Sequence, residues 1–248
     1  MKSYCKEKSG RRLIILSVIA VALLAAIVFC IIYVSDYYKA DEEAAEAFIS
    51  GEPTLFEFDG GLAVLPDGGA RAGFIFYPGG KVEYTAYLPL MEALGEKGIV
   101  AVLLKMPFNL AVLDMNAADG VREKFPEVTK WYIGGHSLGG SMAASYIEKR
   151  GEEFLGLVLL GAYSTADLSQ SGLSVLSVYG SEDGVMNRDK YEKHRDNLPE
   201  NFSELVIDGG NHAYFGMYGE QEGDGTASIS GVAQIMITAE AIDAFIEK

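Results

Sequence analysis

Short apolar runs alternate with helix-like spacing from Thr54 to the C-terminus, and this alternation is the strongest constraint on the fold. Runs of β-branched and aromatic residues indicate buried strands, whereas apolar residues three or four positions apart indicate helices. Strands are predicted at 54–58, 62–65, 73–77, 99–104, 131–133, 155–160, 173–179 and 203–207. Helices are predicted at 84–94, 110–124, 138–149, 188–197 and 232–246.

Most strands from residue 73 onward are uninterrupted apolar runs between helices, which indicates a sheet covered on both faces. Helices between successive strands favour parallel pairing with right-handed crossovers. The first two strands, joined by Asp59-Gly60-Gly61, are instead predicted to form a hairpin. The predicted fold class is therefore α/β, with a mostly parallel sheet and helices on both faces. Such sheets bind ligands at the carboxyl ends of their strands, so functional residues are expected directly after strands.

Ser137 lies in the stretch IGGHSLGG, at 133–140, directly after a predicted strand and before a predicted helix. A sharp turn there forces the serine backbone into a strained conformation and aims the hydroxyl above the edge of the sheet. Gly135 and Gly139 relieve the crowding on either side, and Gly140 lets the helix pack near the sheet. The helix N-terminus favours developing negative charge. Ser137 is therefore predicted to be a nucleophile, and the alternative is a serine that only caps the helix.

A serine hydroxyl needs a base to take its proton, and the chain has three histidines. His136 adjoins Ser137, and its side chain is expected to point away from that of the serine. His194 lies in a predicted helix, where packing or solvation is its simplest role. His212 lies in a glycine-rich loop, DGGNHAYFG, straight after the last strand. His212 is therefore predicted to be the base.

The base needs a carboxylate that fixes its tautomer and stabilises the imidazolium. Asp183 follows the predicted strand 173–179 in a tight turn, YGSEDGV, and is the predicted acid. Glu182 is its immediate rival, and Asp167, after the preceding strand, is the next. Asp208 is more simply explained as a cap of its own turn.

The oxyanion that forms during such a reaction needs backbone N–H donors. One donor is predicted at Leu138, the residue after the nucleophile. The second is predicted in YPGGK, at 77–81, where two glycines allow the chain to turn its amides inward. Gly80 is the predicted donor and Lys81 the alternative, while a plain tight turn would explain the same pattern without a function.

Together these features resemble the α/β-hydrolase superfamily: the chain order Ser137, Asp183, His212, the G-H-S-L-G turn, and the glycine-rich loop after the third strand. The resemblance covers about residues 54–248 and implies an eight-stranded sheet. It also implies hydrolysis of an ester, thioester or amide through an acyl-enzyme. In that scheme Ser137 attacks, His212 transfers the proton, Asp183 orients His212, and Leu138 and Gly80 hold the oxyanion. No metal or organic cofactor is called for.

The segment GDGTASIS after His212 is similar to that of small bacterial hydrolases in the dienelactone-hydrolase-like branch. Dienelactone hydrolases proper use cysteine where this chain has Ser137, so lactone specificity does not carry over. Many relatives insert a cap domain between the strands that here end at Leu160 and begin at Leu173. About a dozen residues separate these two, so we expect an open site suited to small esters, or to acyl groups displayed on a large envelope molecule. Segment 213–231 either lines the pocket or is a solvated loop.

The N-terminus carries a basic tail and a long uncharged segment. The net charge of residues 1–12 is +4, and residues 13–34 carry no charge. These 22 residues make about 33 Å of helix, enough to cross a hydrocarbon core. A cleavable signal peptide would usually have a shorter apolar region, and a lipoprotein signal at Cys30 would need a small residue in place of Phe29.

We therefore predict a cytoplasmic tail at 1–12, a transmembrane helix at 13–34, a stalk at 35–53 and a hydrolase domain at 54–248. Acidic residues follow the span and basic residues precede it, so the positive-inside rule places the N-terminus in the cytoplasm and the hydrolase domain outside. Both cysteines, Cys5 and Cys30, precede or lie within the span. The exported domain therefore cannot form an internal disulfide.

The chain as a whole carries −15, so the portion beyond residue 12 carries −19. This charge excludes nucleic acid as a favoured partner. It also disfavours anionic substrates, although salt screens such repulsion beyond about 8 Å, so neutral or cationic acyl esters are favoured. Two alternatives remain open: an acyltransferase that uses the same acyl-enzyme, and a non-catalytic anchored protein that keeps the fold for binding. The sequence leaves the oligomeric state open.

Overall fold

The structure is a computed structural model that describes residues 2–48 and 53–248. The chain forms two compact units, Met1–Tyr37 and Tyr38–Lys248, which are described separately. The second unit holds the sheet and every predicted site residue.

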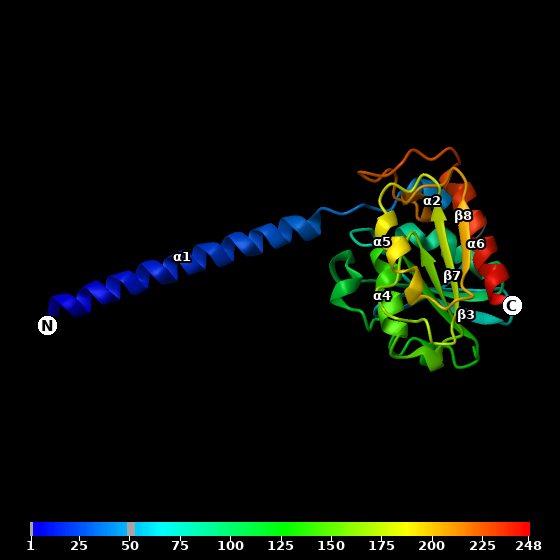
Figure 1. The fold of residues 1–248 in the computed structure, drawn as a ribbon, viewed down its shortest axis with the longest axis horizontal. Coiled ribbons are helices and arrows are strands. Elements are labelled where there is room, and N and C mark those ends of the chain that lie inside the picture. The colour runs from blue at the N-terminus through cyan, green and yellow to red at the C-terminus, as the bar shows by residue number, and fades with distance from the viewer. Residues whose placement is uncertain (1, 49–52) are drawn as a thin grey trace. The chain divides into compact units, whose positions relative to one another are not determined.

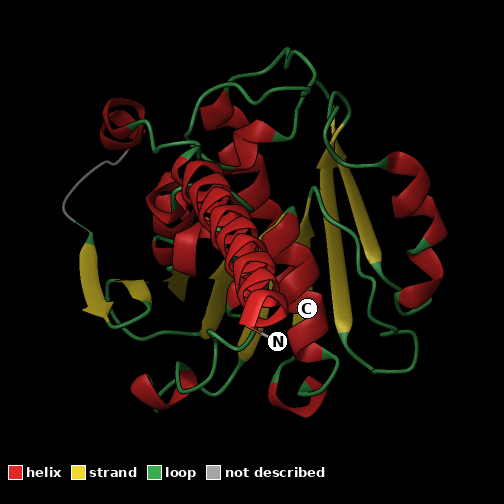
Figure 2. Ribbon diagram, turned by 90° about the vertical axis from the view of Figure 1, so that its left-hand side faces the viewer, coloured by secondary structure: helices red, strands yellow, loops and turns green. Residues whose placement is uncertain are grey.

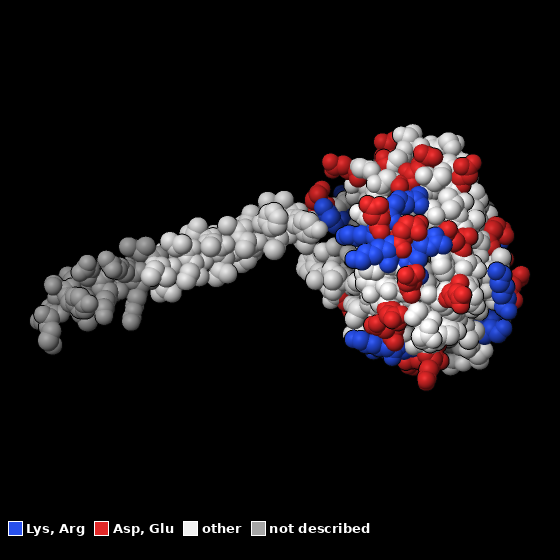
Figure 3. Space-filling model, in the orientation of Figure 1, with Lys and Arg blue, Asp and Glu red and all other residues white. Residues whose placement is uncertain are grey.

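The first unit consists mainly of one helix, α1, from Lys2 to Ser35. Its segment Ile15–Ser35 is long and apolar enough to cross a membrane, and none of that segment is buried. In Figure 3 the segment shows no Lys, Arg, Asp or Glu. Exposure of its large apolar side chains is inconsistent with a core helix of a globular domain. The described residues thus contain one candidate membrane span, with a composition that a signal sequence shares.

The second unit is built on a sheet of eight strands in the order β1-β2-β4-β3-β5-β6-β7-β8. The strands are β1 Thr54–Phe58, β2 Gly61–Leu65, β3 Ala72–Tyr77, β4 Ile99–Leu104, β5 Trp131–His136, β6 Gly156–Leu160, β7 Ser174–Gly180 and β8 Ser203–Ile207. β1 and β2 form the predicted hairpin, and β2 pairs antiparallel with β4. All other neighbours are parallel. The predicted fold class is confirmed.

Helices cover both faces of this sheet (Figures 1 and 2). The α-helices of the second unit are α2 Glu42–Phe48, α3 Leu88–Gly95, α4 Leu138–Ile147, α5 Arg188–Lys193 and α6 Gly231–Ile246. In Figure 1, α4 and α5 lie on one side of the strands and α6 on the other. Alternate residues of β3 point to opposite faces, so Phe74 and Phe76 enter the core that includes α3 and α6, while Ile75 and Tyr77 enter the core that includes α4. Burial on both faces explains the unbroken apolar strands.

The helix predicted at 110–124 is wrong. The chain there forms isolated 3₁₀ turns at Ala111–Leu113 and Arg122–Lys124, preceded by another at Pro107–Asn109. The stretch between the last two turns is rich in Asp and Asn, whose side chains compete with helical hydrogen bonds. The helix predicted at 188–197 is shorter than expected, because α5 ends at Lys193 and a 3₁₀ turn follows at Arg195–Asn197.

Part of the predicted stalk is attached to the second unit. The N–H of Tyr38 donates to the carbonyl of Lys81 at 2.8 Å, and the N–H of Glu83 donates to the carbonyl of Tyr38 at 2.9 Å. The ring of Tyr38 also packs against that of Tyr218, with centroids 5.6 Å apart. The compact unit therefore begins at Tyr38 rather than at Thr54, because an aromatic side chain and two backbone bonds bind this segment to it. The remainder of the predicted stalk includes residues 49–52, which lie outside the described residues.

Candidate active site

Ser137 stands at the sharp turn between β5 and α4. Its dihedral angles, φ 51° and ψ −121°, lie in a region that residues other than glycine rarely occupy. Its N–H donates to the carbonyl of Leu160, at the end of β6, at 2.9 Å. The flanking chain leaves no room for side chains, because a Cβ would lie 2.5 Å from a carbonyl oxygen at Gly135 and 2.3 Å from one at Gly139. The strained serine and the need for both glycines agree with the prediction from sequence.

His212 and Asp183 form a buried pair. Nδ1 of His212 lies 2.9 Å from Oδ2 of Asp183, and the two side chains are 1% and 0% exposed. The other carboxylate oxygen of Asp183 accepts the N–H groups of Val185 and Met186 at 3.0 and 2.8 Å. A carboxylate against Nδ1 keeps the ring proton on that nitrogen, which leaves Nε2 as a proton acceptor.

The imidazole of His212 lies against the serine turn. The ring of His136, the residue before Ser137, has its centroid 4.4 Å from that of His212. Gly161, which follows Leu160, is so close that a Cβ there would lie 2.9 Å from Nδ1 of His212. Nε2 of His212 is buried and has no hydrogen-bond partner among the residues that the structure describes. This nitrogen is therefore a buried and unused proton acceptor next to the residues that flank the serine turn.

The loop after β3 presents one unused backbone N–H. The N–H of Gly79 donates to the hydroxyl of Tyr87 at 3.1 Å, and that of Lys81 donates to the carbonyl of Asn109 at 2.8 Å. The N–H of Gly80 makes no hydrogen bond within the described part of the chain. A Cβ on Gly80 would lie 2.9 Å from the Leu138 side chain, so the two predicted oxyanion donors are neighbours. The alternative, Lys81, has its N–H already occupied.

Tyr87 and His136 support this loop, and sequence analysis missed the role of Tyr87. The Tyr87 oxygen lies 2.7 Å from Nδ1 of His136. That oxygen also accepts the Gly79 N–H, so one buried hydroxyl joins the loop to the His136 ring. Burial, and secondarily the adjacent ring of His212, lower the pKa of His136 well below its usual value. His136 is thus a neutral packing and hydrogen-bonding group beside His212.

The family assignment follows from a match over most of this second unit. A sequence model described as the alpha/beta hydrolase family matches residues 73–236, which include the serine turn, the Asp183–His212 pair and the loop of Gly80. The chain belongs to the α/β-hydrolase family. Among curated proteins, no sequence match is found.

Solved structures share the fold of this α/β-hydrolase family member at low sequence identity. TT1662 from Thermus thermophilus is 14% identical, with a TM-score of 0.58 over 80% of this chain and 100% of that one. A dienelactone hydrolase from Anabaena variabilis is 16% identical, with a TM-score of 0.55 over 77% of this chain and 98% of that one. Est1E from Butyrivibrio proteoclasticus is 14% identical, with a TM-score of 0.56 over 79% and 98%. At these identities the likeness establishes the fold alone.

In this α/β-hydrolase family member, the side chains of the other residues considered as acid or base make different contacts. The carboxylate of Asp167 is exposed and accepts hydrogen bonds from the backbone and hydroxyl of Ser169, which lower its pKa. Glu182 is exposed and accepts a hydrogen bond from the hydroxyl of Ser181, and Asp208 is exposed as well. His194 stacks on Tyr163, with ring centroids 5.5 Å apart, in the packing role expected of it.

Asp224 is a second residue that sequence analysis missed. Its carboxylate accepts the N–H groups of Gly184, beside the predicted acid, and of His212 and Ala213, at distances of 3.0, 3.1 and 2.8 Å. It therefore ties the loop of the acid to the loop of the base. The glycines on both sides of Asp224 were a signal of a tight turn that could have drawn attention to it.

Gln234 holds the other side of the His212 loop. This fully buried residue of α6 accepts the N–H of Asn211 at 3.0 Å and donates to the carbonyl of Asn211 at 2.7 Å. A glutamine within the apolar stripe of the last helix was the corresponding sequence signal. Segment 213–231 is not simply a solvated loop, because most of 213–218 is buried.

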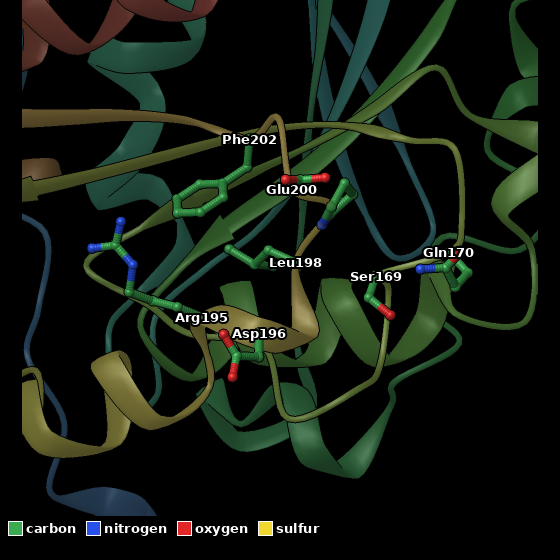
Figure 4. A pocket seen from close by; sticks show the side chains of 8 residues that line it. Ser169, Gln170, Arg195, Asp196, Leu198, Glu200 and Phe202 are labelled. Carbon is green, nitrogen blue, oxygen red and sulfur yellow. The ribbon is translucent and has the colours of Figure 1, made fainter.

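A surface pocket of about 350 Å³ lies away from these residues (Figure 4). Its lining is Ser169, Gln170, Arg195, Asp196, Leu198, Pro199, Glu200 and Phe202, and includes none of the predicted site residues. Within the described residues, no group of three or more His, Cys, Asp or Glu side chains could hold a metal ion.

Proposed function

We propose that this chain is a membrane-anchored serine hydrolase that cleaves carboxylic esters, or thioesters or amides, through an acyl-enzyme. The observation that carries the proposal is the buried His212–Asp183 pair, whose Nε2 has no partner among the described residues and whose imidazole packs against His136, the residue before a serine held at a strained turn. A buried acceptor without a partner costs free energy unless a substrate or nucleophile uses it. The cost is explained if Nε2 receives the proton of Ser137.

In the proposed reaction, Oγ of Ser137 attacks the carbonyl carbon of the ester while Nε2 of His212 takes the hydroxyl proton. The tetrahedral intermediate then collapses, the bond to the leaving alcohol breaks, and His212 returns the proton to that alcohol. Water attacks the resulting acyl-enzyme in the same manner and releases the acid. Asp183 stabilises the imidazolium in both halves, since its carboxylate lies 2.9 Å from Nδ1.

The proposed oxyanion donors are the N–H groups of Gly80 and Leu138. Bonds to Tyr87 and Asn109 hold the residues on each side of Gly80, so its N–H is oriented before substrate arrives. Leu138 is the first residue of α4, where backbone N–H groups have no intrahelical acceptor. Donors that need no reorganisation stabilise the transition state most effectively.

The proposed substrate is a small or surface-displayed acyl ester that is neutral or cationic. Only residues 161–173 separate β6 from β7, which leaves no room for a cap domain over the site. The net charge of −19 beyond residue 12 repels anionic substrates at low salt. No cofactor is required by this chemistry.

The proposed anchor is α1, with the N-terminus in the cytoplasm and the hydrolase domain outside the cell membrane. The basic residues before Leu13 and the acidic residues after Ser35 support this orientation.

The test is labelling of the full chain, in detergent, with a fluorophosphonate that reacts with activated serines. We expect one adduct, on Ser137, located by mass spectrometry of peptides. Ser137→Ala should abolish the labelling, whereas Ser141→Ala, one turn along α4, should retain it. Labelling of a different residue, or none, would overturn the mechanism. Product analysis with an added alcohol then separates hydrolysis from acyl transfer.

A further inference from the structure

The most exposed large apolar side chains of the second unit are clustered in one short segment. Among the described residues of 38–248, they are Phe108, Val112 and Leu113, with exposed fractions of 64%, 57% and 56%. Exposed apolar residues are ordinary when scattered, but a cluster of this kind marks a contact surface. We name residues 107–113 the apolar loop.

The apolar loop borders the proposed active site on two sides. The carbonyl of Asn109 accepts the N–H of Lys81, the residue after Gly80, at 2.8 Å. Its 3₁₀ turn Ala111–Leu113 packs against α4, the helix that starts after Ser137, and Ala111 is fully buried. The loop therefore contacts the residue after Gly80 and the helix that Leu138 begins.

The backbone of the apolar loop is held in an unfavourable conformation that keeps Phe108 exposed. Phe108 and Asn109 both have positive φ angles, 52° and 55°. Such angles are costly for side-chain-bearing residues and persist only where the surroundings impose them. The bond from Lys81 to Asn109 is one such restraint, so the exposure of Phe108 is built into the site.

A short connection links the end of the candidate membrane span to this loop. α1 ends at Ser35, and Tyr38 is already bonded to Lys81 and Glu83. Three residues of extended chain reach at most about 11 Å. Lys81 is in turn bonded to Asn109, so three residues and two backbone hydrogen bonds connect the end of α1 to the apolar loop.

We propose that the apolar loop rests on the bilayer that α1 spans, and that the site takes acyl esters whose chains lie in that bilayer. This inference rests on the proposed function and adds the surface and the class of substrate. Phe108, Val112 and Leu113 enter the upper part of the lipid layer. The exposed Asp114 directly after them stays in water, which limits the depth of insertion.

The test places an indole in the loop and measures its contact with lipid. Full-length Phe108→Trp is reconstituted in phosphatidylcholine vesicles with or without bromine on the acyl chains, since bromine quenches nearby indole emission. The native Trp131 is 3% exposed, so wild-type protein reports the background. We expect bromine to remove at least half of the emission that Phe108→Trp adds.

Two control variants carry the indole on other exposed apolar positions. Leu155→Trp replaces a side chain that is 49% exposed just before β6, at the opposite end of the strands from Ser137. Met236→Trp replaces one that is 37% exposed on α6. Neither should be quenched. Quenching at position 155 or 236 but not at 108 would overturn the proposal. A shielded indole at 108 that bromine does not quench would indicate a protein partner and overturn it as well.

A second measurement compares substrates in the same vesicles. In the variant with Phe108→Ser, Val112→Ser and Leu113→Ser, the ratio of turnover of a long-chain bilayer ester to that of a short water-soluble ester should fall at least fivefold. An unchanged ratio would refute the substrate class. Quenching at position 108 without any ester cleavage by wild-type protein would support the membrane contact of the apolar loop but refute the proposed function. Failure of the membrane contact and failure of the proposed function are therefore distinguishable.

Discussion

Replacement of Asp183 by asparagine should disable the base while leaving the fold intact. Oδ1 of Asp183 accepts two backbone N–H groups at 2.8 and 3.0 Å, and an amide oxygen can accept both. The amide nitrogen then faces Nδ1 of His212 in place of the carboxylate oxygen now 2.9 Å away. As an N–H donor, it favours the tautomer with the proton on Nε2. That tautomer cannot accept the proton of Ser137.

The size of the effect follows from the lost charge. Two unit charges about 4 Å apart interact by about 4 kcal/mol at an effective dielectric constant of about 20. The imidazolium of the transition state loses this stabilisation in Asp183→Asn. Since each ~1.36 kcal/mol is a factor of ten in rate, kcat should fall about a thousandfold.

The assay is hydrolysis of a short nitrophenyl ester together with the rate of fluorophosphonate labelling at Ser137. Asp167→Asn, which changes an exposed carboxylate bonded to Ser169, should behave as wild type in both. Thermal unfolding should be nearly unchanged in Asp183→Asn. If this variant retains more than a tenth of the wild-type kcat, the pair does not work as a base and its orienting acid, and the reasoning is refuted.

Three further changes test the supporting structure, with stability measured by thermal unfolding in detergent. Gly139→Ala places a Cβ 2.3 Å from carbonyl oxygens and should lower the free energy of unfolding by at least ~3 kcal/mol. Gly69→Ala, whose Cβ would have nothing within 4 Å, should change it by no more than about 0.5 kcal/mol. Equal effects of the two changes would contradict the crowding argument. Burial and the charge of a neighbouring glutamate raise the pKa of Glu92 from 4.5 to about 7, so the folded state holds this proton more tightly and stability falls as pH rises through that window. Glu92→Gln should therefore be more stable than wild type at pH 8 by ~1–2 kcal/mol, a figure reduced for residual solvent access to the carboxylate. Near pH 4.5 the two proteins should be equally stable. A stability difference that does not change with pH would exclude the raised pKa of Glu92 as its cause. Asp224→Ala removes the acceptor that joins the loop of Asp183 to the loop of His212, and should lower kcat by ~10–100-fold with KM nearly unchanged. Glu220→Ala, which changes an exposed carboxylate, should leave both constants unaltered. A change in KM alone after Asp224→Ala would instead indicate a substrate contact.

The architecture was predictable because it depends on local periodicity and on how covered sheets are built. Apolar runs between helical patterns predicted the mostly parallel sheet that the strand order confirms. Glycine spacing predicted the strained turn at Ser137, since crowding at a sharp turn acts on neighbouring residues of the chain. The helix expected at 110–124 failed for the converse reason. Its apolar residues do not form one helical face, because Ala111 packs in the core while Val112 and Leu113 are exposed.

The sequence by itself determined the fold class and the small set of residues that could meet at the carboxyl edge of the sheet. It favoured Asp183 as the acid but left Glu182 and Asp167 as alternatives, because they are adjacent along the chain or follow a neighbouring strand. Only the tertiary structure decided that Asp183 faces His212 and that the N–H of Gly80, not that of Lys81, is unused. It alone bound Tyr38 and the apolar loop to the same stretch of chain after Gly80. The reason is physical: periodicity acts over a few residues, whereas which donor meets which acceptor depends on groups that folding brings together from distant parts of the chain.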